Sequence, residues 1–183
     1  MNHIAIPRVR LSFPSLFQTA IFAGDDTGKY EATFILDKIK HAKYIKTIQK
    51  EMQNLADEKF KGKLPPDEKL CLKDGDDSVR EEDIGKFKIK ASTKKRPEIR
   101  DNDSERTLLT EEDADKKNYF YAGSFCNCII SMWAQDNKYG KRINGTLLGI
   151  QWCCDGEPFG SLGLDADAFD AFGDAEEDDD VPF

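Results

Sequence analysis

The sequence has 183 residues, of which 39% are hydrophobic and 34% are charged, and its formal net charge is −8. This length corresponds to about one domain, and no apolar run approaches the roughly 20 residues that a membrane span requires. Because residues 1–10 do not have the pattern of a signal peptide, we expect a soluble, intracellular protein with no membrane partner.

The N-terminal third of the chain predicts two strands followed by a helix. Residues 4–17 and 30–36 alternate apolar and polar side chains, a pattern typical of half-buried strands. Between residues 38 and 60 the apolar side chains recur at spacings of three and four, which predicts an amphipathic helix. Asp37 is expected to cap this helix.

The middle of the chain predicts two charged loops around one strand. Residues 70–85 form the first loop. Residues 86–93 alternate strictly, with lysines on one face and apolar side chains on the other, so they predict a third strand. Residues 100–117 form the second loop, which is expected to contain a short helix at 111–116.

The clearest β-hairpin joins residues 119–133 to residues 142–152 through a polar turn that contains a glycine. With it, the chain has five or so curved strands and one inserted helix. We therefore predict a mainly β fold with one or two helices, an OB-fold-like, five-stranded, partly open barrel over residues 1–160. A β-sandwich is the alternative.

The C-terminal segment differs sharply in charge from the rest of the chain. No Lys or Arg follows Arg142, and residues 155–183 contain 11 acidic side chains. Residues 1–154 hold all 27 basic and the other 24 acidic side chains, a net charge of +3. A polyanionic segment with so little apolar surface is not expected to fold alone, so residues 161–183 are predicted to be a disordered acidic tail.

The last six residues predict a peptide that another protein captures. The aromatic ring of Phe183 can fill a pocket while basic residues of the partner bind the carboxylates. The expected partner-binding residues are Asp178, Asp179, Asp180, Val181, Pro182 and Phe183. A tail that serves only solubility is the alternative.

The sequence offers little for catalysis, a cofactor or a metal. The five cysteines include Cys126, Cys128, Cys153 and Cys154, but neither pair has the spacing of a zinc site. No phosphate-binding loop or nucleophile motif is present. We therefore expect no enzyme and no cofactor. Asp101 and Asp103 could hold magnesium in a nuclease, although solvated loop carboxylates are the usual explanation for such a pair.

Binding of single-stranded DNA requires cations along the phosphates and aromatic faces on which bases stack. Both occur here, on the strand of residues 86–93 with its exit loop and on the hairpin. The expected DNA contacts are Arg8, Arg10, Lys88, Lys90, Lys94, Lys95, Arg96, Phe125, Trp133, Tyr139, Lys141 and Arg142. Two alternatives remain: the lysines are the solvated face of a strand, and Phe125 and Trp133 pack in the core.

Two resemblances support this interpretation. The final six residues resemble the Asp-Asp-Asp-Ile-Pro-Phe ending of bacterial single-stranded DNA-binding proteins, and only Val181 departs from it. The body resembles phage-encoded single-stranded DNA-binding proteins. The matching segments are VRLSFP at 9–14, KY at 29–30, ASTKKRP at 91–97, YAG at 121–123, GIQ at 149–151 and DGEPFG at 155–160.

The resemblance implies an OB fold with an acidic tail, protection of exposed strands, recruitment of replication and recombination proteins, and a homodimer. Together with the residues above, it predicts a non-enzymatic, sequence-independent single-stranded DNA-binding protein of phage replication or recombination, in the cytoplasm of an infected bacterium. The alternatives are an adaptor or inhibitor that occupies host proteins through the tail, and a strand-annealing recombination protein.

Overall fold

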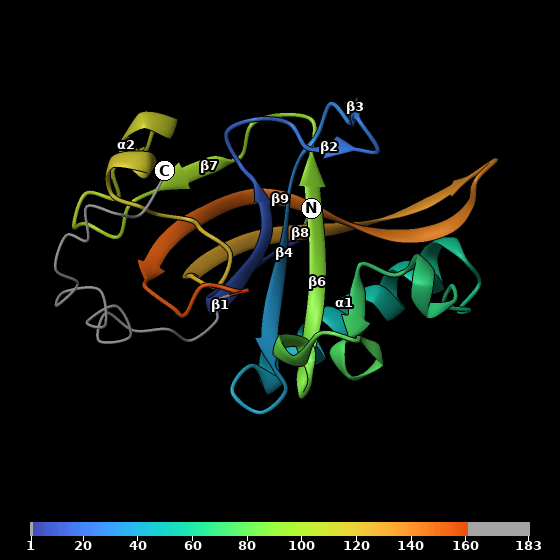
Figure 1. Ribbon diagram of the computed structural model, residues 1–183. Helices are drawn as coiled ribbons and strands as arrows, with labels where there is room; N and C mark the ends of the chain where they lie inside the picture. Colours follow the sequence, from blue (N-terminus) through green and yellow to red (C-terminus); the bar gives the residue numbers. More distant parts are fainter. Residues whose placement is uncertain (1, 161–183) are drawn as a thin grey trace, which may run out of the picture.

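The computed structural model describes residues 2–160 (Figure 1). The tail predicted over residues 161–183, including the partner-binding residues 178–183, lies outside the described residues. Within residues 2–160, none of the helices is long and apolar enough to cross a membrane.

Five long strands close into a barrel, which confirms the predicted mainly β, OB-type fold. They are β1 (His3–Ser15), β4 (Tyr30–Asp37), β6 (Lys86–Thr93), β8 (Phe125–Asn137) and β9 (Gly140–Cys154). Going around the barrel, β4 lies between β1 and β6, β8 lies on the other side of β1, and β9 pairs with β8. A short parallel pairing of β6 with β9 completes the circle.

The barrel interior is filled by the apolar side of each alternating strand. Ile89 and Ala91 of β6 are buried, whereas Lys90 between them is exposed on the outer surface. On β8, Cys126, Cys128 and Ile130 are buried and form a small apolar face. Small side chains inside a tight barrel leave room for the larger ones opposite them.

Helix α1 (Ala42–Lys59) packs its apolar side, which includes Ile48 and Met52, into the core beside β1 and β8. It begins four residues later than the sequence pattern predicted. Asp37 does not cap the helix as predicted, because its carboxylate accepts hydrogen bonds from the backbone N–H groups of Ile39 and Lys40, in the turn before the helix. The pKa of Asp37 is lowered most by the hydrogen bond from the Lys40 backbone, and further by the ammonium of Lys86 and the Ile39 backbone.

Short elements surround the barrel. They are β2 (Ile21–Phe22), β3 (Asp25–Asp26), β5 (Leu72–Asp74), β7 (Glu98–Arg100), α2 (Glu111–Lys116) and the 3-10 turns η1 (Asp67–Lys69), η2 (Gly75–Asp77) and η3 (Glu81–Asp83). Helix α2 falls on the residues predicted for it and begins with a capping box between Thr110 and Asp113. β5 and β7 were not predicted, because three residues are too few to show an alternation.

The parallel pairing of β6 with β9 depends on one glycine. Gly145 lies opposite Ala91. A Cβ atom on Gly145 would lie 2.6 Å from the carbonyl oxygen of Lys90, closer than side chains approach a backbone oxygen. The two backbones can therefore meet because this position has no side chain.

We predict that Gly145→Ala destabilises the barrel by about 1–3 kcal/mol, because the added methyl group must push β6 and β9 apart. Gly149→Ala is the matched control on the same strand, since its Cβ would meet its nearest atom at 3.4 Å. The free energy of unfolding in urea measures both changes. Equal losses for the two variants would show that the close approach at Gly145 does not hold the barrel closed.

Candidate nucleic-acid interface

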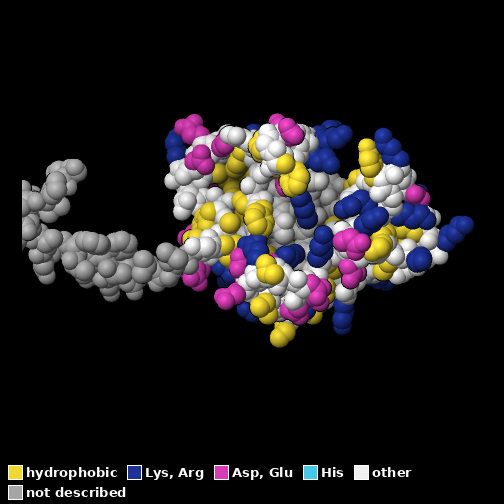
Figure 2. All heavy atoms as spheres, turned by 45° about the vertical axis from the view of Figure 1, so that its right-hand side comes forward, with side chains coloured by type: hydrophobic (Ala, Val, Ile, Leu, Met, Phe, Trp, Pro, Cys, Tyr) yellow, Lys and Arg dark blue, Asp and Glu magenta, His cyan; other side chains and the backbone are white. Residues whose placement is uncertain are grey.

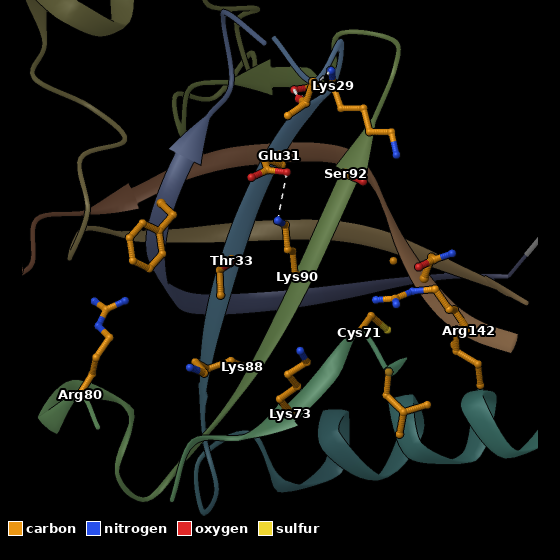
Figure 3. Close-up of a pocket in the computed structure, with 16 residues that line it drawn as sticks. Lys29, Glu31, Thr33, Cys71, Lys73, Arg80, Lys88, Lys90, Ser92 and Arg142 are labelled. Carbon is orange, nitrogen blue, oxygen red and sulfur yellow. Dashed lines mark hydrogen bonds and ion pairs between the residues drawn. The ribbon is translucent and has the colours of Figure 1, made fainter. Parts of the chain in front are cut away.

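A groove of about 460 Å³ crosses the outer surface of β4 and β6. Its floor carries Thr33, Lys88 and Lys90, and β5 and β9 form one side of it. In Figure 3 the labelled side chains of Lys73, Lys88 and Lys90 extend into this space, and Arg142 approaches from β9.

Strand register explains why these side chains share one face. Thr33 pairs with Lys90 and Ile35 pairs with Lys88 in the antiparallel ladder of β4 and β6. Side chains on directly paired residues point to the same side of a sheet, so the strictly alternating lysines of β6 lie beside the alternate residues of β4. The predicted lysine face is therefore the floor of the groove.

The groove is strongly basic. Among residues 2–160, its lining contains one carboxylate, Glu31, and six basic side chains: Lys29, Lys73, Arg80, Lys88, Lys90 and Arg142. Figure 2 shows Lys and Arg side chains gathered around the hollow on this side of the molecule, with acidic side chains among them. An excess of one charge sign in a concave surface attracts ligands of the opposite charge.

Half of these cations already have an acidic partner. The ammonium nitrogen of Lys90 lies 3.2 Å from a carboxylate oxygen of Glu31, and that of Lys88 lies 2.9 Å from a carboxylate oxygen of Asp83. Arg80 pairs with Glu82. Among residues 2–160, Lys29, Lys73 and Arg142 have no carboxylate within ion-pair distance. These three have the greatest capacity to bind an added anion.

The segment of residues 75–85, here called the strap, lies against the groove floor. Its Asp83 is fully buried and accepts hydrogen bonds from Lys88 and from the hydroxyl of Ser78 at 2.8 Å. Gly75 allows the close approach, because a Cβ there would lie 2.1 Å from the carbonyl oxygen of Asp83. The strap thereby holds Lys88 and places Arg80 at the groove edge.

Exposed aromatic side chains lie in the groove lining and on the β8–β9 hairpin that borders it. Trp133 is 46% exposed and is the cross-strand neighbour of Asn144, which lines the groove. Tyr139 is 70% exposed in the turn between β8 and β9. The alternative interpretation, in which Trp133 packs in the core, is therefore wrong. Phe13 lines the groove itself and is 66% exposed.

Some predicted residues lie near the groove without lining it. Lys94, Lys95 and Arg96 are exposed in the turn that follows β6, where Arg96 lies over the ring of Phe17 at 4.9 Å. Lys141 is exposed on β9, with its ammonium 5.4 Å from the centre of the Phe60 ring.

Arg8, Arg10 and Phe125 lie apart from the other predicted residues. All three line a second cavity of about 420 Å³ that shares no lining residue with the groove. Arg10 is also a structural anchor, since its guanidinium donates hydrogen bonds to the carbonyl oxygens of Gly123 and Glu157. The sequence thus predicted one interface where the structure has two separate hollows.

Sequence reasoning missed four side chains of the groove. Lys73 belongs to the short β5, and Arg80 lies in the strap, two segments that had been assigned to a loop. Lys29 ends the turn before β4. For Phe13, alternation with the buried Val9 and Leu11 indicates an inward side chain, so no signal in the pattern could place it outside.

The described residues give the metal and thiol candidates other roles. Asp101 is buried and pairs with Lys117, and Asp103 accepts hydrogen bonds from Thr107. Within residues 2–160, no cluster of three His, Cys, Asp or Glu side chains could hold a metal ion. Burial raises the pKa of Cys71 to about 11 and that of Cys126 well above its ordinary value, so these thiols stay protonated.

The chain matches one family over almost all of its length. A family model described as the single-stranded DNA-binding protein of Enterobacter phage Enc34 matches residues 2–182. Among curated proteins, the chain is similar to putative protein p50 of Acyrthosiphon pisum secondary endosymbiont phage 1. The two are 28% identical over 186 residues, which covers 96% of this chain and 97% of that protein.

Solved structures agree with this match. The single-stranded DNA-binding protein from bacteriophage Enc34 is 32% identical, with a TM-score of 0.73, over 93% of this chain and 89% of that one. The same protein in complex with single-stranded DNA is 33% identical, with a TM-score of 0.74, over 86% and 89% of the two chains. Protein gp2.5 of bacteriophage T7, at 10% identity and a TM-score of 0.56 over 90% and 98%, shares the fold.

We predict that the two tryptophans respond differently to an added quencher. Trp152 is 5% exposed and stacks on Tyr119 with ring centres 4.0 Å apart, whereas Trp133 is exposed beside the groove. Acrylamide should therefore quench Trp133 strongly and Trp152 weakly. Trp133→Phe should remove most of the quenchable emission and leave a weak, blue-shifted signal. Strong quenching in that variant would contradict the burial of Trp152.

Proposed function

Because the chain belongs to the family of the single-stranded DNA-binding protein of Enterobacter phage Enc34, we propose that it binds single-stranded DNA without sequence preference. The protein would act in phage DNA replication or recombination inside the infected bacterium, by covering exposed strands. It would do so as a binding protein and not as an enzyme. Residues 1–160 would bind DNA, and residues 161–183 would recruit partners.

The basic groove is the observation that carries this proposal. OB folds bind oligonucleotides on the face of their second and third strands, between the loop after the first strand and the loop between the last two. Here those strands are β4 and β6, and the loops are the one with β2 and β3 and the tip of the β8–β9 hairpin. The groove occupies that face.

The kinds of side chain in the groove explain the lack of sequence preference. Lysine and arginine contacts to phosphates carry no base information, and aromatic faces stack on any base. Lys73, Lys88, Lys90 and Arg142 would contact phosphates in the groove, and Trp133 and Tyr139 would stack on bases beside it. The exposed turn at 94–96 would extend the phosphate path beyond β6.

The tail would give the protein its second activity. Its final residues have the composition of a docking peptide, with one aromatic ring behind three carboxylates. We propose that replication or recombination proteins bind residues 178–183 while the groove holds DNA. A homodimer, which the family resemblance implied, stays a prediction that sedimentation velocity of the full chain tests.

Removing two unpaired groove cations should weaken DNA binding in a salt-dependent way. For Lys73→Ala with Arg142→Ala, the slope of log K against log salt for oligo-dT should fall by about 1.4, because each lost phosphate contact on a single strand contributes about 0.7. Lys46→Ala with Lys50→Ala, on the exposed side of α1, is the matched control. Trp133 fluorescence measures both.

Two results of that titration would contradict the proposal. If the wild-type protein fails to bind oligo-dT at low salt, the function is not DNA binding and a tail-based adaptor becomes the better explanation. If the α1 control lowers the slope as much as the groove variant does, the DNA follows another surface.

Removal of Phe183 should abolish capture of replication proteins and leave DNA binding unchanged, because the acidic residues remain. The lost ring would otherwise bury about 150–250 Å² in the partner. Phe172→Ala removes another aromatic ring of the same tail and is the matched control. A pull-down from the bacterial host measures capture. Equal recovery with all three proteins would reduce the tail to a solubility device.

A further inference from the structure

Three arginines and three phenylalanines alternate in one continuous row along the outer side of β1. The guanidinium carbon of Arg80 lies 4.6 Å from the Phe13 ring centre and 5.6 Å from that of Phe159. The guanidinium carbon of Arg10 lies 4.3 Å from Phe159 and 5.8 Å from Phe125. That of Arg8 lies 5.5 Å from Phe125. We call these six side chains the ladder.

The ladder joins the two hollows described above. Its first members, Phe13 and Arg80, line the groove, and its last members, Arg10, Phe125 and Arg8, line the second cavity. Phe159 stands between the two groups. A strand leaving the groove over Phe13 would therefore meet alternating rings and guanidinium groups until it reached the second cavity.

The two end members of the ladder are held in strained backbone. Arg8 has a φ of 50° and Phe13 a φ of 48°, both in the left-handed region that non-glycine residues rarely adopt. Each stands where the register of β1 shifts against a neighbouring strand. Such bulges turn a side chain to a new direction, and here each one turns a ladder member outward.

Core packing does not explain this strain. Phe13 is 66% exposed, although Val9 and Leu11 before it are fully buried, and Arg8 is exposed as well. Turning a phenylalanine ring out into solvent sacrifices the burial of a large apolar side chain. Strain and exposure together point to a ligand that the ring contacts.

Part of the ladder also has a structural task. Arg10 binds the carbonyl oxygens of Gly123 and Glu157, and Phe159 donates its backbone N–H to Ala122. Arg10 and Phe159 therefore fix residues 155–159 on the barrel. Phe13 and Arg8 make no such side-chain hydrogen bonds among residues 2–160, so they are the positions at which a ligand-binding role can be tested without unfolding this segment.

We propose that the ladder is a stacking track that carries the bases of single-stranded DNA from the groove, across β1, to the second cavity. Bases stack on phenylalanine rings and on the planes of arginine guanidinium groups, and the same arginines neutralise the phosphates that follow. This assignment rests on the proposed function and adds a second, separate part to the DNA path.

Phe13→Gly tests the groove end of the track. The loss of one stacked ring should weaken binding of the full chain to oligo-dT by about 5- to 150-fold. Because glycine accepts a positive φ, Phe13→Gly should be at least as stable in urea as Phe13→Ala, the reverse of the usual order in strands. Leu108→Ala, which removes another exposed apolar side chain outside both hollows, should leave binding unchanged.

An abasic oligonucleotide of the same length separates stacking from charge. Phe13→Gly should bind it as well as the wild type does, because no base remains to stack. Arg8→Gly, at the far end, should weaken only those members of an oligo-dT length series that are long enough to leave the groove.

The outcomes distinguish the track from the proposed function. If the wild type fails to bind oligo-dT, the proposed function itself is wrong. If the wild type binds oligo-dT, and Phe13→Gly and Phe13→Ala bind it as tightly as the wild type does at every length, the track is wrong and the groove alone holds the strand. Equal losses on oligo-dT and on the abasic oligonucleotide would also overturn the track, because the ring would then act through the fold and not through bases.

Discussion

The rest of the interface depends on the close approach of β9 to β6. This parallel contact pairs Gly145 with Ala91 and closes the barrel. It also places Arg142 and Asn144 of β9 beside the lysines of β6, although more than 50 residues separate the two segments in the chain. The side of the groove that β9 forms therefore depends on a position of β9 that has no side chain. Closing the barrel and assembling a basic surface are the same structural event.

Some cations of the groove are paired with carboxylates of the protein and others are not. Lys88 and Lys90 hold carboxylates of the protein, so binding a phosphate there replaces one anion by another. Lys73 and Arg142 have no such competitor among residues 2–160, so they could bind an added anion without breaking an ion pair of these residues. One side-chain oxygen of the buried Asp83 has no hydrogen-bond partner among these residues. Of the two ion pairs, the one between Lys88 and Asp83 therefore leaves a buried polar atom unsatisfied.

Strand β1 shows how irregular backbone adds a surface to a regular barrel. A perfectly alternating β1 would direct Phe13 into the core with Val9 and Leu11. The bulge there turns the ring outward instead, to the side that already carries Arg80 and the groove. Strained residues of this kind persist when the surrounding structure holds them in place. In β1 the backbone pairing with β4 on one side and with β8 on the other supplies that support.

The sequence by itself determined the elements with a strong period, which are β1, β4, β6, the β8–β9 hairpin and α1, and from them it predicted an OB-type barrel with a β-sandwich as the alternative. It also separated a basic body from an acidic tail, because charge is a local property of the chain. It could not show that Lys29, Lys73 and Arg80 join Lys88, Lys90 and Arg142 in one groove, or that Arg8, Arg10 and Phe125 lie elsewhere. Those groupings arise from strand register, barrel closure and two bulges, which are contacts between distant segments. Alternation states which side chains share a face of one strand, but only the tertiary structure decides which faces meet.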